Sequence, residues 1–216
     1  MIPKEYPRVV IEAVEPQVDG GRFPIKRVVG EKVTVSADIY KEGHFKLAAV
    51  LKARQAGETE WLESAMNQGD NDRWFGEFTV TAIGRWEYTI EAYAEIYLSW
   101  VDEITKKSVP GADLRSELLE GLVVLKKSAA VAQGEDLSRM LGIIAAIETA
   151  LAAGEQRGAI DLGIGKVMRN MMASYPDRSE GHQMTPPLTI MVNRPIARFA
   201  AWYEFFPRSQ GNLPYR

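Results

Sequence analysis

The pattern of hydrophobic and polar residues changes its period near Trp100. Before that residue, apolar and polar side chains alternate, which is typical of half-buried β-strands. After it, leucine, isoleucine and methionine recur at intervals of three and four residues, as they do on one face of an α-helix. The pattern therefore predicts a β region that is followed by a helical region.

Five segments of the β region alternate, and the clearest has Trp86, Tyr88, Ile90, Ala92 and Ala94 on its apolar face. The segments are residues 9–13, 33–39, 47–51, 74–81 and 85–95. Turn-forming stretches separate them: Asp19-Gly20-Gly21, Val29-Gly30-Glu31, Gly69-Asp70-Asn71-Asp72 and Ile83-Gly84. Short alternating strands with regular turns predict an antiparallel β-sandwich. No helical pattern interrupts this region, which disfavours a parallel α/β sheet.

Three helical stripes follow a shorter predicted helix at residues 99–107. The stripes are Leu114, Leu118, Leu122, Leu125; then Leu137, Met140, Leu141, Ile144, Ile147, Leu151; then Ile160, Ile164, Val167, Met168, Met171. Gly111, Gly134 and Gly154 lie between them, where helix ends are expected. Short loops favour antiparallel neighbours, so residues 99–175 are predicted to form a small helical bundle. The hydrophobic core of such a bundle is small, and we expect the bundle to pack against the sandwich or against another chain.

The period returns to two after the helices. Residues 176–185 are predicted to form a linker. The spacing of Leu188, Ile190 and Val192 at every second position predicts a strand, and residues 199–206 are predicted to form a second, aromatic-rich strand. The simplest topology places the bundle as an insertion in a sandwich of residues 1–98 and 186–209. The alternative is two sequential domains with a separate hairpin, which is disfavoured because a lone hairpin is marginally stable. An aromatic strand here is expected to lead into more protein, and residues 210–216 would start a missing catalytic domain.

Composition limits the classes of function. The chain has 216 residues, of which 46% are hydrophobic and 25% charged, so a globular core is expected. A net charge of −3 without a polybasic run argues against nucleic-acid and membrane partners. No cysteine is present, which excludes disulfides and thiolate metal sites. No signal core or membrane-spanning run is found, so we expect a soluble, cytoplasmic protein.

Candidate nucleophilic and phosphate-binding motifs are weak. The two histidines, His44 and His182, lie beside glycines without a nucleophile motif, and we interpret both as solvated loop residues rather than triad or zinc residues. The stretch from Gly158 to Lys166 resembles a phosphate loop but lacks a preceding strand and a Ser or Thr after the lysine. Close helix–helix packing explains its glycines more simply.

Two pairs of adjacent acids, Asp102-Glu103 and Glu135-Asp136, lie on predicted helices. Adjacent helical residues point to different faces and cannot share a proton. The second pair opens a helix, where negative charge is favourable beside the helix dipole. We therefore assign no catalytic, cofactor-binding or metal-binding residue in this chain.

Aromatic residues on the strands are the remaining signal. Trp74, Trp86 and Tyr88 fall on the apolar face and are predicted to pack in the core. Phe75 and Tyr93 fall on the outer face, where they could contact a sugar, another domain or a partner subunit. Exposed apolar area favours the protein contact.

Several motifs together resemble the N-terminal region of bacterial maltosyltransferases, which use α-maltose 1-phosphate to extend α-1,4-glucan. They are Pro7-Arg8-Val9-Val10-Ile11-Glu12, Val14-Glu15-Pro16, residues 19–27, Asn71-Asp72-Arg73-Trp74, Gly76-Glu77-Phe78, Gly84-Arg85-Trp86-Glu87-Tyr88-Thr89 and residues 202–209. The resemblance covers nearly the whole chain and is weakest in the helices. The joint occurrence of the motifs in this order is more specific than any one of them.

The resemblance implies an immunoglobulin-like domain with an inserted helical bundle, followed by an amylase-type (β/α)8 barrel. The barrel supplies the Asp nucleophile and Glu acid/base of a retaining mechanism, and no residue here matches those positions. It also implies that the sandwich and bundle contribute to a homodimer interface. We therefore expect a non-catalytic N-terminal portion that serves domain support and dimerisation. The alternatives are an α-glucan-binding module and a generic protein-interaction module.

Overall fold

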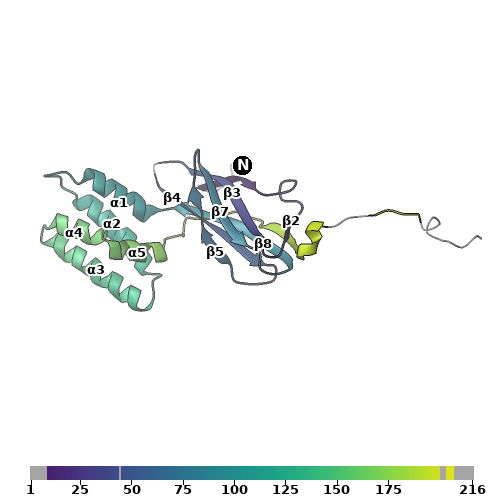
Figure 1. The fold of residues 1–216 in the computed structure, drawn as a ribbon. Helices are drawn as coiled ribbons and strands as arrows, with labels where there is room; N and C mark the ends of the chain where they lie inside the picture. The colour runs from purple at the N-terminus through teal and green to yellow at the C-terminus, as the bar shows by residue number, and fades with distance from the viewer. Residues whose placement is uncertain (1–8, 44, 200–202, 207–216) are drawn as a thin grey trace, which may run out of the picture.

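The computed structural model describes residues 9–43, 45–199 and 203–206. These residues form a mixed α+β fold, with the β-sheets at one end and five α-helices at the other (Figure 1). The helices follow the eighth strand, and the chain then returns to the sheets. The predicted change from strands to helices is therefore confirmed.

One sheet has four strands in the order β1–β3–β7–β6, all paired antiparallel. Its strands are β1 (Val9–Glu15), β3 (Lys32–Lys41), β7 (Arg73–Thr79) and β6 (Asn67–Gln68). Three of these come from the predicted alternating segments. The alternation did not reveal β6, because a two-residue strand carries no period.

The second sheet has the order β2–β10–β8–β4–β5, and β9 pairs with β8. Its strands are β2 (Ile25–Val28), β10 (Leu188–Asn193), β8 (Gly84–Ala94), β4 (Leu47–Gln55), β5 (Leu62–Ala65) and β9 (His182–Gln183). All pairs are antiparallel except β2 with β10, which is parallel and was not predicted. Strand β10 pairs with β8, although the five helices lie between the two strands in the sequence.

The two sheets share one hydrophobic core, in which the predicted inward-facing residues of β3 are buried. Those of β8 are buried too, except Ala94, which is half-buried. The aromatic side chains in this core keep partners for their polar atoms, as buried Trp and Tyr require. Trp74 Nε1 donates a hydrogen bond to the carbonyl oxygen of Ile39 at 3.2 Å. Trp86 Nε1 donates to Ala82 at 2.9 Å, and the Tyr88 hydroxyl donates to Pro16. The core assignment of these three aromatics is confirmed.

Strand β1 departs from simple alternation near its end. Ala13 was predicted to face inward with Val9, but it is exposed and Val14 is buried instead. The pairing register with β3 shifts between Glu12 and Glu15, and Ala13 has a φ of 48°. A bulge of this kind reverses which side chains face the core.

Five helices form the helical region, and a second hydrophobic cluster lies among them. They are α1 (Ile96–Lys107), α2 (Arg115–Ala129), α3 (Gly134–Ala152), α4 (Gln156–Gly163) and α5 (Lys166–Ser174). Helix α1 begins three residues earlier than predicted. The third stripe is divided between α4 and α5, because the helix is interrupted at Ile164 and Gly165. No helix in the described part of the chain is long and apolar enough to cross a membrane.

Trp100 on α1 belongs to this second cluster and contacts two other helices. A Cβ atom on Gly121 of α2 would lie 2.3 Å from the Trp100 ring, and one on Gly163 of α4 would lie 2.9 Å from it. The indole Nε1 donates to the Glu117 carbonyl oxygen at 2.7 Å. The Tyr97 hydroxyl, one turn away, donates to Gly163 at 3.0 Å. The two glycines therefore allow three helices to meet around one aromatic ring.

The predicted aromatic strand at residues 199–206 is wrong for the residues that the structure describes. Phe199 ends a 3₁₀ helix, Pro195–Phe199, and residues 203–206 form neither helix nor strand. Phe199, Tyr203 and Phe206 are at least 77% exposed. A segment rich in aromatic residues indicates surface that needs an apolar partner, but it does not specify that the segment itself is a strand. Residues 200–202 and the predicted domain start at 210–216 lie outside the described residues.

The packing around Trp100 makes a prediction about stability. Gly121→Ala is expected to lower the free energy of unfolding by about 1–3 kcal/mol, because the added methyl group overpacks the ring contact. Gly142→Ala in α3 is the matched control, since a Cβ there meets no atom within 4 Å. It should raise stability by about 0.5–1 kcal/mol through helix propensity. Urea unfolding followed by circular dichroism measures both, and equal effects of the two variants would contradict the packing argument.

Candidate functional site

The structure describes one of the two histidines of the chain. His44 lies outside the described residues. His182 was predicted to be a solvated loop residue, but it lies in β9 opposite Ala92 and is half-buried. No group of three or more His, Cys, Asp or Glu residues suited to a metal ion occurs within the described ranges.

The glycine-rich stretch from Gly158 to Lys166 spans the end of α4 and the start of α5. The helix-packing interpretation is confirmed for Gly163, which lies against Trp100. It is wrong for Gly158, where a Cβ would meet no atom within 4 Å. Gly165 is the N-cap residue of α5.

The adjacent acids form ion pairs and hydrogen bonds with nearby side chains. Asp102 and Glu103 each form an ion pair of 2.6 Å with the lysine four residues later. Glu135 lies in the first turn of α3, where it pairs with Arg139 at 2.7 Å, and Asp136 accepts a hydrogen bond from Tyr175 at 3.1 Å. These contacts agree with the predicted structural role of both pairs.

The two aromatics that were predicted to face outward have different surroundings. Phe75 is 45% exposed, as predicted, whereas Tyr93 is only 6% exposed. The Arg178 guanidinium lies over the Tyr93 ring at 5.4 Å from its centroid. Burial raises the pKa of the Tyr93 hydroxyl above its ordinary value. The prediction for Tyr93 was wrong because alternation along β8 cannot reveal that the segment after α5 covers the outer face.

A polar network holds that returning segment on the six-stranded sheet. Glu91 on β8 pairs with Lys52 at 2.7 Å and with Arg178 at 3.1 Å. Glu63 on β5 pairs with Arg178 at 3.0 Å, and Lys52 donates to Gln183 at 3.3 Å. Lys52 and Glu91 are mostly buried, so these pairs are screened less than surface pairs. Strand β9 therefore lies inside the predicted linker, residues 176–185, which the structure shows to be partly docked.

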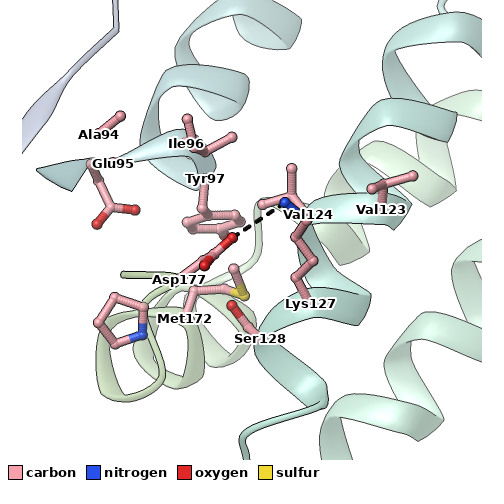
Figure 2. A pocket seen from close by; sticks show the side chains of 11 residues that line it. Ala94, Glu95, Ile96, Tyr97, Val123, Val124, Lys127, Ser128, Met172 and Asp177 are labelled. Carbon is pink, nitrogen blue, oxygen red and sulfur yellow. Dashed lines mark ion pairs between the residues drawn. The ribbon is translucent and has the colours of Figure 1, made fainter. Parts of the chain in front are cut away.

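A small cavity lies where β8 passes into α1, next to α2 and the segment after α5. We call it the junction cavity, and Figure 2 shows the side chains around it. The polar residues that line it are Glu95, Tyr97, Lys127, Ser128 and Asp177. Its volume is about 60 Å³, whereas small-molecule pockets typically have about 300–1,000 Å³. The cavity is too small for a sugar.

The titratable groups around the junction cavity are perturbed in different directions. Burial raises the pKa of the Glu95 carboxyl above its ordinary value and raises the pKa of Tyr97 to about 12. Hydrogen bonds from Ser179, and then the nearby Lys127, hold the pKa of Asp177 below its ordinary value. Lys127 Nζ and an Asp177 carboxylate oxygen are 3.4 Å apart (Figure 2).

A larger apolar surface lies along α2 and α3. Leu119 and Val123 on α2 and Leu141 on α3 are 49–58% exposed, and we call this surface the α2–α3 face. A groove lies on each side of the Lys126–Glu148 ion pair, whose atoms are 2.6 Å apart. Leu141 was predicted to belong to the buried stripe, and Leu119 and Val123 were not singled out. The spacing of four residues between Leu119 and Val123 places them on one side of a helix, and this spacing could have revealed the exposed face.

Fold and surfaces together define a mixed α+β protein in which a helical region with an exposed apolar face interrupts the strands of one sheet. The family model for domain N/S of α-1,4-glucan:maltose-1-phosphate maltosyltransferase matches residues 7–194. The chain belongs to this family. The resemblance seen in the strand motifs is thereby confirmed.

Several curated proteins named α-1,4-glucan:maltose-1-phosphate maltosyltransferase are similar to the chain. The protein from Myxococcus xanthus is 42% identical over 208 residues, which cover 93% of this chain and 31% of that protein. The Rhodospirillum rubrum protein is 36% identical, with 96% of this chain and 32% of the relative covered. The Chlorobaculum tepidum protein is 33% identical, with 96% and 30% covered. The chain thus spans about 30% of the length of the curated relatives it matches.

The raised pKa of Glu95 predicts a pH dependence of stability. The folded state holds this proton more tightly than the unfolded state, whose ordinary value is 4.5. Stability therefore falls as pH rises from about 4.5 through the raised folded value, and the loss persists at higher pH. Glu95→Gln is expected to be more stable than the original chain at pH 7, with the difference disappearing near pH 4.

Urea unfolding between pH 4 and pH 8 measures this difference. Glu155→Gln is the matched control, because Glu95 and Glu155 are the N-cap residues of α1 and α4, whereas Glu155 is exposed to solvent. A pH-independent difference between Glu95→Gln and the original chain would count against burial as the cause.

Proposed function

We propose that this chain is the non-catalytic N-terminal portion of a maltosyltransferase that transfers maltosyl from α-maltose 1-phosphate to α-1,4-glucan. Within it, the chain serves domain support and dimerisation. The observation that carries the assembly role is the exposed apolar α2–α3 face. The names of the curated relatives support the reaction assigned to the whole protein.

The proposal includes an immunoglobulin-like β-sandwich, residues 1–98 and 186–209, with an inserted helical bundle, residues 99–175, and a connecting segment, residues 176–185. Two separate hydrophobic clusters, one among the strands and one among the helices, support this division. The sheet order supports the insertion, because β8 and β10 are neighbours although the helices lie between them in the sequence.

Dimerisation is assigned to the α2–α3 face. Exposed apolar residues that form a contiguous patch are typical of protein interaction sites. Leu119 and Val123 lie one turn apart on α2, and Leu141 lies on the adjacent helix α3. The Lys126–Glu148 ion pair connects the two helices, and its opposite charges leave no net charge between the two grooves. The same face on a second copy would cover these side chains in a two-fold arrangement.

Domain support is assigned to the aromatic segment after β10. Phe199, Tyr203, Phe205 and Phe206 are 61–89% exposed, which is unfavourable for four aromatic side chains close together in the chain. We assign their partner as the catalytic barrel of the same polypeptide, which carries the catalytic carboxylates. The curated relatives, about three times as long as this chain, have room for such a domain.

We propose no separate glucan-binding function, because the aromatic surface predicted for it included Tyr93, which is buried under Arg178. Cytoplasmic localisation remains part of the proposal. The absence of cysteine supports it, since disulfides form mainly in oxidising compartments and a protein of the reducing cytosol does not need them.

The dimerisation role predicts that charge on the α2–α3 face separates the subunits. The double variant Leu119→Glu, Leu141→Glu is expected to sediment as a monomer at concentrations where the original chain is a dimer. Burying two carboxylates in an apolar interface is strongly unfavourable. Because both side chains are about half-exposed, the fold itself should tolerate the changes.

Val109→Glu, on an exposed loop residue outside the face, is the matched control and should leave the dimer intact. Analytical ultracentrifugation over a range of concentrations makes the comparison. An original chain that is monomeric throughout, or a double variant that stays dimeric, would refute dimerisation through this face.

The non-catalytic role makes a separate prediction. The pure chain, incubated with α-maltose 1-phosphate and glycogen, is expected to release no inorganic phosphate, because the catalytic carboxylates are assigned to the barrel. The Myxococcus xanthus relative is the positive control. Phosphate release by the pure chain, above that of a heat-treated sample, would contradict the proposed non-catalytic role.

A further inference from the structure

The helical region and the sheets meet over a narrow joint. Among the described residues, no α-helix makes an extensive contact with a strand. The chain crosses the joint once at Glu95 and again after α5. Near the first crossing, the Lys46 amide donates to Ser99 Oγ at 2.8 Å, and Lys46 Nζ lies 4.0 Å from Asp102. A few polar contacts therefore carry much of the connection between the two regions.

Ser128 on α2 has an unusual environment at this joint. Its side chain is 0% exposed. Among the buried side-chain oxygen and nitrogen atoms of the described residues, Ser128 Oγ alone lacks a hydrogen-bond partner. A buried hydroxyl without a partner is destabilising, and such groups in folded proteins usually bind ordered water.

The junction cavity has the space and the chemistry that a water site requires. Ser128 lines it, together with the ion-paired Lys127 and Asp177 and the carboxyl group of Glu95 (Figure 2). A volume of about 60 Å³ has room for a few water molecules. The side chains offer hydrogen-bond donors and acceptors from α2, from the segment after α5 and from the start of α1.

We propose that the junction cavity is a binding site for one or a few ordered water molecules, which hydrogen-bond Ser128 Oγ and bridge α2 to the chain crossings at Glu95 and Asp177. An apolar ligand would leave the hydroxyl without a partner, and a sugar would not fit. The water makes the joint more rigid and so holds the α2–α3 face at a constant angle to the sheets. This inference does not depend on the proposed function.

The sign of a stability change tests the proposal. Ser128→Ala is expected to lower the urea midpoint, because the bridging water loses its anchor on α2. If the hydroxyl had no water, the same variant would raise the midpoint by removing an unpartnered polar group. Ser116→Ala is the matched control for helix propensity, since Ser116 lies on the same helix and is exposed. A Ser128→Ala midpoint equal to or above that of Ser116→Ala overturns the proposal.

Two structural measurements complete the test. A high-resolution crystal structure is expected to show water within hydrogen-bond distance of Ser128 Oγ; a dry cavity, or an Oγ that donates to the Val124 carbonyl oxygen, overturns the site. Amide hydrogen exchange at residues 95–99 and 175–181 should be faster in Ser128→Ala than in Ser116→Ala. Unchanged exchange there overturns the bridging role.

Discussion

The arrangement of the helices depends on the close packing of Trp100 against two glycines. Gly121 and Gly163 leave the space that the indole ring occupies, so α1, α2 and α4 meet around it. Helix α1 follows directly from β8, the strand at the centre of the larger sheet. The ring contact therefore fixes how closely α2 and α4 approach α1, which continues from this strand. Since interiors are packed at near-crystalline density, a single added methyl group is enough to disturb this arrangement.

The two regions have separate hydrophobic cores, and polar contacts join them. At one crossing, Lys46 bonds to the first turns of α1; at the other, Lys52, Glu91 and Arg178 dock the returning segment on the sheet. The junction cavity lies between these crossings. This organisation places α2 and α3 with the other helices at one end of the molecule and the sheets at the other (Figure 1).

Sequence patterns predicted the long elements well and the short ones poorly. The alternation in β3 and β8 and the leucine stripe of α2 correspond to buried faces. Strands of two to four residues, such as β2, β6 and β9, carry too few positions for a period. The candidate surfaces were predicted only in part: Phe75 is exposed as expected, whereas Leu141 is exposed despite its place in a helical stripe. Burial of Tyr93 depends on Arg178, which is 85 positions away in the sequence, and no local pattern encodes that contact.

Local periodicity and motif order were sufficient for the class of fold, the position of the helices within the chain and the family, because each depends on residues close together in the sequence. Tertiary structure decided which apolar residues stay exposed, how β10 returns to β8, and where Ser128 is left without a partner. These features depend on which distant segments cover each side chain. The hydrophobic effect acts on total exposed surface and not on sequence neighbours, so only the folded chain could settle them.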